Sequence, residues 1–511
     1  MRIFLIILLF CWLSCDALAA TVKRGLGPEP DSLDPHRAQG LSALNVARDL
    51  YEGLTTLDAK GQIQGGVAQE WMVHDGGYRY EFILRKDARW SDGSPVTATD
   101  FVRGLRHALM PSTTAPYAGL LDIIHNARGV RRGELPESSL GVKALGINRL
   151  QIVLESPSAL LLPVLTHPVS YPRQKSFGRA YNGAFVMAER VAQSHLLLKP
   201  NPHFHSAASL RLDALMWVVS EDNNSELSRY RAGELHITET IPVGRYNWLK
   251  KNLPDDLRVS PYLGTYYLAF NLRHPSFKDQ LKLRRALSLA IDRETLTRVV
   301  TSSGEQPAFG LVAPGLEDYA YPEQVEQTMT QQERLGLAQA LYRQSGYGED
   351  NPLRISLRYN TSTLQRRIAA AISAMWREYL GVVTELHNEE WKVFINSRRQ
   401  GSNTQVVRGG WIADLADPVS FLEPFAADSS LNYTGFNDTQ YDQWLRRAAN
   451  AENPFQRGDA LRRAEARLLS QQPIIPLYYY VSRHLVKPGV RGYVDNVMDI
   501  HLSRYLSVAE P

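Results

Sequence analysis

Hydrophobic and polar positions alternate with a period of two in several short stretches of the chain. These stretches are rich in aromatic and β-branched residues and predict strands over 78–84, 150–154, 215–219, 353–359, 382–386 and 474–481. Other stretches repeat apolar residues every three to four positions and predict helices over 99–109, 280–291, 363–380 and 453–471. Gly381 and Pro473 follow two of these helices and act as stop signals. Such alternation of helices and strands indicates an α/β fold with sheets flanked by helices.

The length of 511 residues predicts about two or three domains. The sequence contains no internal repeat, no low-complexity tract and no long linker rich in Pro, Gly or Ser. We therefore expect the domains to be joined by short crossing strands rather than by a tether.

The N-terminus has the pattern of a secretory signal peptide over residues 1–19. Arg2 gives a short positive region, 3–13 is an apolar run too short to span a bilayer, and Ala17-Leu-Ala19 fits a cleavage site. Leu13-Ser-Cys15 also resembles part of a lipidation motif, so a lipoprotein anchored through Cys15 is the alternative. The two cysteines, Cys11 and Cys15, both lie in this segment, and a large exported chain needs no disulfides.

Composition and motifs favour binding over catalysis. The formal net charge of +4 gives no argument for a nucleic-acid partner, whereas 24 Tyr and 9 Trp suit a ligand cleft as well as a core. The sequence lacks the common nucleophile-elbow, zinc-protease, Walker and dinucleotide motifs, and we expect no cofactor. His203 and His205 would form a metal pair on a strand, but a surface turn after Pro202 is the favoured interpretation. The carboxylates Glu389-Glu390 remain open as glycosidase acids, although nothing around them supports that role.

The segment Arg408-Gly-Gly-Trp-Ile-Ala-Asp-Leu-Ala-Asp-Pro418 concentrates chemistry in eleven residues. Its glycines allow close approach of backbone or ligand, and Trp411 offers a flat apolar wall with one donor. Asp414 is an acid among apolar neighbours, and a carboxylate placed there needs a cation, from Arg408 or from a ligand's ammonium. From these residues alone, a strand end closed by an Asp417-Pro418 turn is the simpler interpretation.

Many segments in one order resemble the extracytoplasmic solute-binding proteins of peptide ABC importers, the oligopeptide-binding class, with murein-peptide-binding relatives also similar. The resemblance runs from about Pro28 to Tyr505. The segments that carry it are Ser32-Leu-Asp-Pro-His36, Arg48-Asp-Leu-Tyr-Glu-Gly53, 84–93 with 97–101, Arg229-Tyr-Arg-Ala-Gly233, 264–271, 285–293, Tyr359-Asn-Thr-Ser362, Glu390-Trp-Lys392, 408–418 and Pro476-Leu-Tyr-Tyr-Tyr480.

The resemblance implies a two-lobed periplasmic-binding-protein fold with an extra inserted domain, three domains around a hinged cleft. Lobe I would comprise residues 20–42, 169–263 and 483–511, the inserted domain 43–168, and lobe II 264–482. Two crossings between the lobes would act as a hinge, and closure would trap the ligand.

The resemblance also implies a peptide site. Family members bind extended peptides between the lobes through main-chain hydrogen bonds, and Asp414 matches the aspartate that holds the peptide's α-ammonium. The other positions that match the site are Tyr117, Glu29, Asn360, Trp391, Arg398, Arg408, Trp411 and Asn432. Arg398 and Arg408 would bind peptide carboxylates, or alternatively form salt bridges within a lobe. The alternative for the tryptophans is a place in the core.

The sequence departs from the family at positions that bear on peptide choice. Gly264 and Ile412 stand where some relatives carry a cysteine pair, so the fold does without that bridge. Gln365 and Arg399 replace histidines found in some relatives, and one residue is inserted between Gly401 and Arg408. Because these last positions face the C-terminal end of the ligand, the preferred peptide length stays open.

The leading hypothesis is a monomeric Gram-negative periplasmic protein, without catalysis, metal or nucleic-acid partner. It would capture short peptides with a free α-amino group and deliver them to an inner-membrane ABC permease. A dedicated carrier of murein tripeptide, or of nickel, haem, sugar or antimicrobial peptide, is the alternative within the binding class. A secreted peptidase or glycosidase is the alternative from another class.

Overall fold

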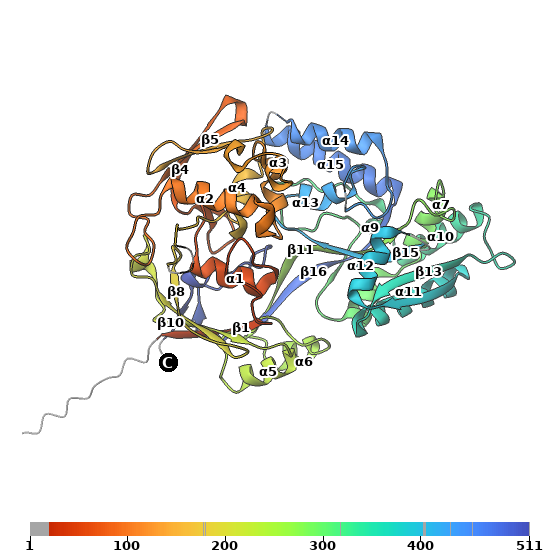
Figure 1. Ribbon diagram of the computed structural model, residues 1–511. Helices are drawn as coiled ribbons and strands as arrows, with labels where there is room; N and C mark the ends of the chain where they lie inside the picture. Colours follow the sequence, from red (N-terminus) through yellow and green to blue (C-terminus); the bar gives the residue numbers. More distant parts are fainter. Residues whose placement is uncertain are drawn as a thin grey trace, which may run out of the picture.

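The computed structural model describes residues 20–509 except 177, 179, 317, 402–404, 430 and 452, and the side chains of 392 and 399 are also not described. The predicted signal peptide with Cys11 and Cys15 therefore lies outside the described residues, as does part of the 401–408 stretch. Within the described part of the chain, no helix is long and apolar enough to cross a membrane. Figure 1 shows two bodies connected by the long strands β11 and β16.

Lobe I is built on a four-stranded sheet with the order β1-β10-β9-β8. Its parallel pair is β1 (Thr21–Gly27) with β10 (Ala214–Val219), and β9 (His195–Pro200) and β8 (Phe185–Val191) follow antiparallel. Ile237 bridges Arg24 of β1 and Val486 near the C-terminus, so three distant segments of the chain meet here. Helix α1 (Gly40–Leu50) spans the predicted boundary between lobe I and residues 43–168. The remaining elements of lobe I are α5 (Asn223–Arg231), α6 (Tyr246–Asn252), β17 (Val490–Arg491) and β18 (Ser507–Val508).

Residues 43–168 contribute an antiparallel sheet with the order β4-β5-β7-β6, which lies beside the lobe I sheet in Figure 1. Helix α2 begins at a capping box formed by Thr97 and Asp100. One buried cluster contains Phe82 and Phe101 of this region together with Val22 and Leu198 of lobe I, so the two share a hydrophobic core. The elements are β2 (Thr55–Leu57), β3 (Ile63–Gly65), β4 (Ala68–His74), β5 (Arg79–Leu84), α2 (Ala98–Leu109), α3 (Ala127–Arg131), β6 (Val142–Ala144), β7 (Arg149–Val153) and α4 (Leu161–Val164).

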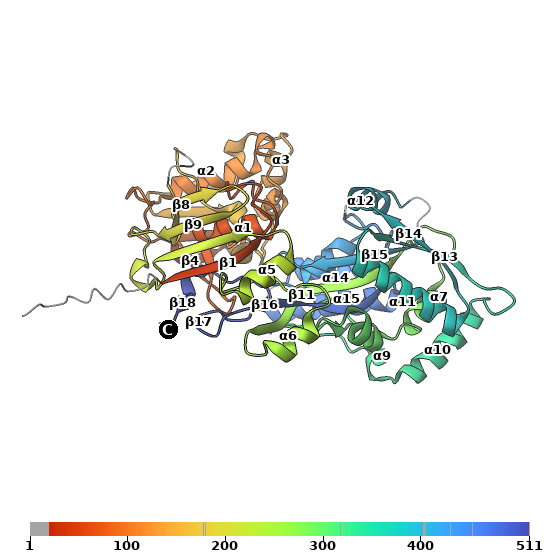
Figure 2. The same cartoon turned by 90° about the horizontal axis from the view of Figure 1, so that it is seen from below.

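Lobe II is a six-stranded mixed sheet with the order β12-β16-β11-β15-β13-β14, covered by helices on both faces (Figure 2). Along β11, Tyr266 and Leu268 belong to one buried cluster, while Tyr267 and Ala269 belong to the cluster on the opposite face. A strand with period two that is buried on both faces reads as a continuous apolar run. The strands are β11 (Leu257–Phe270), β12 (Gln306–Pro307), β13 (Arg354–Asn360), β14 (Val383–Glu389), β15 (Val406–Ile412) and β16 (Ile474–Leu485).

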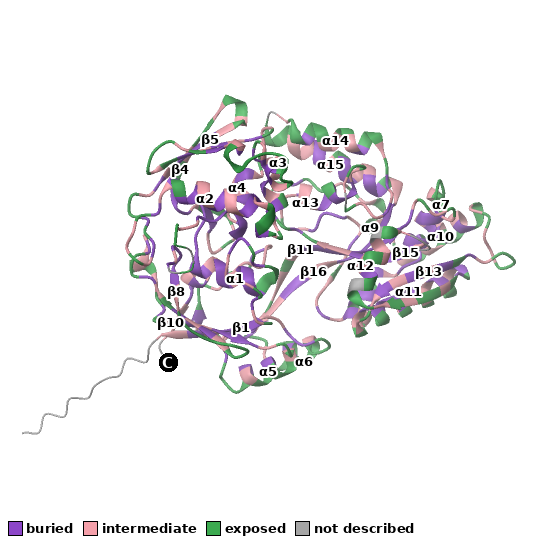
Figure 3. Ribbon diagram, in the orientation of Figure 1, coloured by how far each residue is buried: buried purple, intermediate pink, exposed green. Residues whose placement is uncertain are grey.

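The helices of lobe II carry their polar faces outward, as the exposed edges of α11, α14 and α15 in Figure 3 show. Their bounds are α7 (Leu281–Leu289), α8 (Arg293–Thr295), α9 (Val325–Thr328), α10 (Gln331–Gln344), α11 (Thr363–Leu380), α12 (Trp391–Gln400), α13 (Val419–Leu422), α14 (Thr439–Ala449) and α15 (Pro454–Gln471). Helix α11 ends at Gly381 in the left-handed conformation, with φ of 72°, the geometry that favours glycine at this position.

Strands β11 and β16 run antiparallel from one lobe into the other. Residues 257–261 pair with 481–485, and residues 265–269 pair with 474–479, with a register irregularity between Pro261 and Thr265. The two pairing blocks therefore lie on either side of a short irregular stretch that contains Gly264. Such a stretch is where a change of angle between the lobes costs few hydrogen bonds.

Each strand and helix predicted from the periodicity is found, and each begins within one residue of its predicted start. The preference for a turn at His203 and His205 is confirmed, because these residues follow Pro202 in turns rather than in a strand. His205 bonds through Nε2 to Glu52 Oε2 at 2.7 Å, which commits that imidazole to an internal ion pair.

Candidate functional site

The Arg408–Pro418 segment runs along β15 and then leaves the sheet where the two lobes meet. Strand β15 pairs antiparallel with β11, so that Gly409 and Gly410 lie opposite Tyr267 and Tyr266. A Cβ atom at Gly409 would lie 2.3 Å from the Tyr267 ring, and one at Gly410 would lie 2.7 Å from the hydroxyl of Tyr480. Because real Cβ atoms do not come this close to other heavy atoms, the two glycines are what allows the tyrosines to pack against this strand.

Arg408 extends from β15 into a group of tyrosines. Its guanidinium carbon lies 5.2 Å from the ring centre of Tyr266, and its Nε is buried without a hydrogen-bond partner. Burial opposes the charge of Arg408, but the hydroxyls of Tyr266, Tyr480 and Tyr478 raise its pKa above the usual value. Among the residues that the structure describes, Arg408 forms no ion pair, so the salt bridge considered for it is not found. The Arg408 guanidinium is therefore stabilised by tyrosine hydroxyl groups and by an aromatic ring instead of by a carboxylate.

Asp414 lies just beyond the end of β15, between two hydrophobic cores. Its neighbour Ala413 is buried in a core of lobe II, whereas Leu415 belongs to the core shared by lobe I and residues 43–168. The backbone of Ala413 donates to the carbonyl of Leu263 at 2.8 Å, which anchors the segment to β11. Asp414 is exposed to solvent, and in the described part of the chain its carboxylate has no hydrogen-bond or ion-pair partner.

The surroundings of Asp414 are already partly dry. Desolvation by the neighbouring protein raises the pKa of its carboxyl above the usual value. Tyr117 faces it from the inserted domain: burial raises the pKa of Tyr117, a backbone hydrogen bond from Gly40 lowers it, and the charge of Asp414 raises it further. The Tyr117 ring also packs on His167 with 4.7 Å between centroids. The charge of Asp414 therefore acts on Tyr117 from the other side of the boundary between the domains.

The other end of the site is formed by the carboxyl ends of parallel strands. Strand β13 is parallel to both β14 and β15, so Asn360, Glu389 and the end of β15 share one edge of the sheet. Ligands of open α/β sheets bind outside this edge. Arg358 of β13 forms an ion pair with Glu389, whose other oxygen is buried without a partner.

Several buried polar atoms of β13, β14, β15 and α12 have no hydrogen-bond partner among the described residues. The lobe II atoms of this kind include Arg358 Nε, Asn360 Oδ1, Glu389 Oε2, Arg398 Nε, Arg408 Nε and Trp411 Nε1. Buried polar groups are normally satisfied, and each one left unpaired costs roughly 1–3 kcal/mol. A polar ligand that reached these atoms would offset part of that cost.

Helix α12 places two of the predicted site residues beside this edge. Trp391, at its first residue, is 49% exposed, which excludes the core alternative for this tryptophan. Arg398 lies with its guanidinium carbon 4.5 Å from the ring centre of Tyr433 and, within the described residues, has no ion-pair partner. Trp411 packs in part against the lobe II core, so its ring serves packing while its N–H remains unpaired.

Two predicted site residues have side chains that are occupied by local structure. The carboxylate of Glu29 accepts hydrogen bonds from Arg190 and from the backbone and side chain of Gln193, on the hairpin between β8 and β9. The amide of Asn432 donates to the carbonyls of Phe425, Ala426 and Phe436, and its oxygen accepts from Thr434. Any contact of these two residues with a ligand stays a prediction.

The departures from the family pattern have visible consequences. Gly264 and Ile412 are direct partners across β11 and β15, so a cysteine pair at these positions would be adjacent, and here they are bridged by backbone pairing alone. Gln365 accepts a hydrogen bond from the hydroxyl of buried Tyr266 at 2.5 Å, which places it behind the tyrosine group. The side chain of Arg399 lies outside the described residues.

Sequence reasoning missed the tyrosine group around Arg408 and the Arg358–Glu389 pair. Both depend on which residues of separate strands lie side by side, and a single sequence does not give that register. The one available signal was that Arg358 and Glu389 lie near the ends of predicted strands, where an α/β sheet binds ligands.

Comparison with known proteins agrees with this architecture. The family described as bacterial extracellular solute-binding proteins, family 5 Middle, matches residues 62–433. The periplasmic oligopeptide-binding protein OppA of Escherichia coli is 35% identical over 93% of this chain and 89% of its own length. The periplasmic murein peptide-binding protein MppA of Escherichia coli is also 35% identical, over 95% of this chain and 93% of its own length.

Solved structures show the same fold. The unliganded open form of the murein tripeptide-binding protein MppA superposes with a TM-score of 0.87 at 35% identity, covering 97% of this chain and 98% of that structure. The complex of Haemophilus influenzae OppA with the peptide RPPGFSPFR gives a TM-score of 0.78 at 30% identity, covering 96% of this chain and 99% of that structure. This chain has the multidomain α/β fold of periplasmic binding proteins and belongs to the bacterial extracellular solute-binding proteins of family 5.

Proposed function

We propose that this protein captures short peptides in extended form between its lobes and delivers them to an ABC permease, without chemical change to the peptide. The observation that carries the proposal is Asp414, a partly desolvated carboxylate without a partner among the described residues, whose chain neighbours pack in separate cores and whose charge acts on Tyr117. A peptide's α-ammonium has three donors and a positive charge, which is the complement that this carboxylate needs.

The far part of the site supports the same substrate class. Arg408 and Arg398 have no ion pairs among the described residues, and a peptide's carboxylate groups would pair with them. Backbone groups of an extended peptide would satisfy unpaired atoms such as Asn360 Oδ1 and Trp411 Nε1. Main-chain recognition of this kind reads few side chains, so we expect broad peptide specificity.

Two relatives and one solved complex have names that state a peptide ligand: OppA, MppA and the OppA complex with RPPGFSPFR. The relatives named here are periplasmic, and export through the signal peptide at residues 1–19 would bring this chain to the same compartment. Glu389 is paired with Arg358 and held by Ser397, so the carboxylates Glu389-Glu390 have the environment of a binding site rather than of a glycosidase pair.

Murein tripeptide is the second candidate ligand, because the open MppA structure has a TM-score of 0.87 with this chain. Calorimetry distinguishes the two ligand classes by comparing the affinity for ordinary tripeptides with the affinity for γ-linked peptides that contain D-residues. A clear preference for the γ-linked peptides would assign the protein to murein peptides rather than to general peptide uptake.

The experiment that tests the proposal compares one tripeptide with a free α-amino group and the same tripeptide after N-acetylation. We expect the free peptide to bind and the acetylated peptide to bind at least about tenfold more weakly, because one charge-assisted hydrogen bond contributes roughly 1.5–3 kcal/mol. Mass spectrometry after long incubation should recover the free peptide intact. Equal affinity for the two peptides, or cleavage of the free one, would contradict the proposal.

A further inference from the structure

Two histidines and an aspartate lie close together near the end of β16, apart from the site described above. His484 lies near the end of β16, and Asp499 and His501 lie in the C-terminal segment that follows. The Nε2 atoms of His484 and His501 lie 2.9 and 3.0 Å from the same oxygen, Oδ1 of Asp499. All three side chains are largely buried, with exposures of 12%, 5% and 17% in the order His484, His501, Asp499.

The opposite nitrogen of each ring fixes its tautomer. Nδ1 of His484 lies 3.0 Å from the carbonyl oxygen of Thr238, and Nδ1 of His501 lies 3.1 Å from that of Val494. A carbonyl oxygen only accepts hydrogen bonds, so each Nδ1 carries the proton. In the neutral imidazole the lone pair is then on Nε2. Burial lowers the pKa of His484 but Asp499 raises it above the usual value overall, so without a metal ion Nε2 of His484 donates to the carboxylate, and a bound metal ion would replace that proton.

This arrangement is the one that metal-binding histidines adopt. A ligating histidine commonly donates its other N–H to a backbone carbonyl, which fixes the ring and directs the lone pair at the ion. One divalent cation would satisfy both Nε2 atoms and the carboxylate together. The three ligand atoms already lie within 4.8 Å of one another, and bonds of about 2.0–2.2 Å to such an ion require only a small adjustment.

The immediate environment is compatible with a bound cation. The hydroxyl of Ser482 donates to Asp499 Oδ1 at 2.6 Å and supports the orientation of the carboxylate. The ring of Tyr493 stacks on His501 with 3.9 Å between centroids, which limits access of water from that side. The nearby cation Arg24 donates to the carbonyl of His501 and lies over the Trp217 ring.

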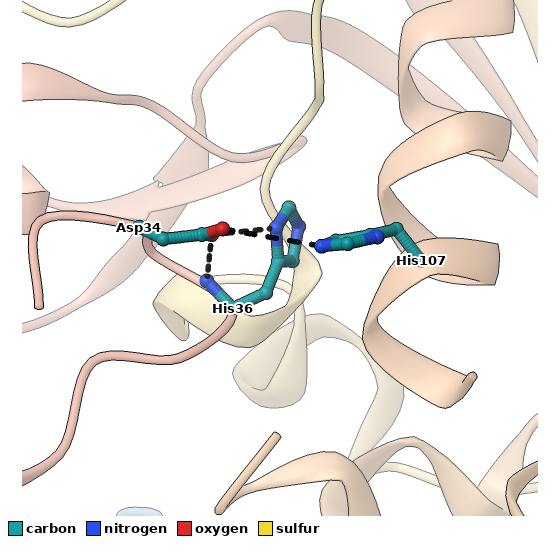
Figure 4. A group of neighbouring side chains, drawn as sticks. All are labelled: Asp34, His36 and His107. Carbon is teal, nitrogen blue, oxygen red and sulfur yellow. Dashed lines mark hydrogen bonds and ion pairs between the residues drawn. The ribbon is translucent and has the colours of Figure 1, made fainter. Parts of the chain in front are cut away.

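A second group of the same residue types provides a contrast. Figure 4 shows Asp34, His36 and His107, which also approach one another. Here Arg173 lies 3.1 Å from Oδ2 of Asp34, while Nε2 of His107 is 3.9 Å from that oxygen. An arginine already neutralises this carboxylate, so this group is an ion-pair network and a matched control.

We propose that His484, Asp499 and His501 bind one divalent transition-metal ion, with Zn²⁺ as the representative ion. Two imidazoles, one carboxylate and an open position for water form a donor set that suits zinc. The ion would fasten the end of β16 to the C-terminal segment.

The test uses the full mature chain, freed of metal by a chelator and titrated with Zn²⁺ in a calorimeter. We expect one zinc ion per chain, with affinity reduced at least about tenfold in His501→Gln and in Asp499→Asn. His107→Gln, in the contrasting cluster, should bind zinc as the native protein does. Zinc bound with equal affinity by His501→Gln would show adventitious surface binding and would overturn the proposal, as would the absence of stoichiometric binding by the native chain.

A second measurement does not depend on how well the variants fold. Cobalt(II) added to the metal-free native protein should give the visible absorption of a site with nitrogen ligands and low coordination number, and one equivalent of zinc should remove it. Saturating zinc should also raise the thermal unfolding midpoint of the native protein but not that of His501→Gln. An absorption spectrum identical to that of hydrated cobalt would refute the site.

Discussion

Asp414→Asn removes the charge that the proposed function assigns to the peptide's amino end, and it changes the side-chain volume little. The native carboxylate has no partner among the described residues and a raised pKa, so in the free protein the charge is poorly compensated. The ligand's ammonium supplies that compensation, and a hydrogen bond between charged groups contributes roughly 1.5–3 kcal/mol. At 25 °C this corresponds to a loss of affinity of about tenfold to about 150-fold.

Isothermal titration calorimetry with a free tripeptide measures this loss, and Asp417→Asn provides the matched control from the same segment. Asp417 pairs with Arg457 at 2.8 Å and accepts a hydrogen bond from the backbone of Val419, so its variant should lose thermal stability while keeping affinity. In Asp414→Asn, N-acetylation of the peptide should have little further effect, because both changes remove the same interaction. An affinity of Asp414→Asn within twofold of the native value would refute the reasoning.

Three further predictions concern pH, stability and shape. Peptide affinity should be full above the raised pKa of Asp414 and should fall as the pH drops through that pKa. The fall should begin at a higher pH than for an aspartate with the usual pKa of 3.8. A C-terminally amidated peptide isolates this effect, and Asp414→Asn should abolish it. Glu465→Ala should lower the thermal unfolding midpoint, because buried Glu465 accepts hydrogen bonds from the hydroxyl of Tyr319 and from the backbone of Leu311 and Val312. The loss of these bonds should lower the free energy of unfolding by roughly 3 kcal/mol or more. Glu378→Ala, at an exposed position, is the control. X-ray scattering should show a smaller radius of gyration with saturating tripeptide, because the chain is similar to an open unliganded structure; an unchanged radius would contradict lobe closure.

Local patterns in the sequence are enough for the helices and strands but not for the way they meet. Helix α11 could be bounded from sequence because its apolar period and the glycine at 381 both act within a few residues. The tyrosine group around Arg408 comes from β11, β15 and β16, and only the register of three strands brings Tyr266 and Tyr480 to one arginine.

Asp414 illustrates the limit for the site. An acid between apolar residues before an Asp-Pro turn is equally typical of a strand end, and only the order of many other segments favoured a ligand role. The structure adds that its neighbours belong to separate cores and that its carboxylate has no partner among the residues that the structure describes. Glu29 and Asn432 show the reverse case, since a matched position does not reveal that a side chain is already bonded to its own loop.

The placement of Ala413 and Leu415 in different cores has a consequence for how ligands of different length are accommodated. Because Ala413 and Leu415 pack in different cores, the residue between them is held where the cores meet, and the proposed function makes Asp414 the point from which a bound peptide starts. If the proposed contact with the α-ammonium holds, every bound peptide starts at the same place, and differences in peptide length fall at the opposite end. Selection for longer or shorter peptides would act on α12 and the ends of β13 and β14, while Asp414 is retained.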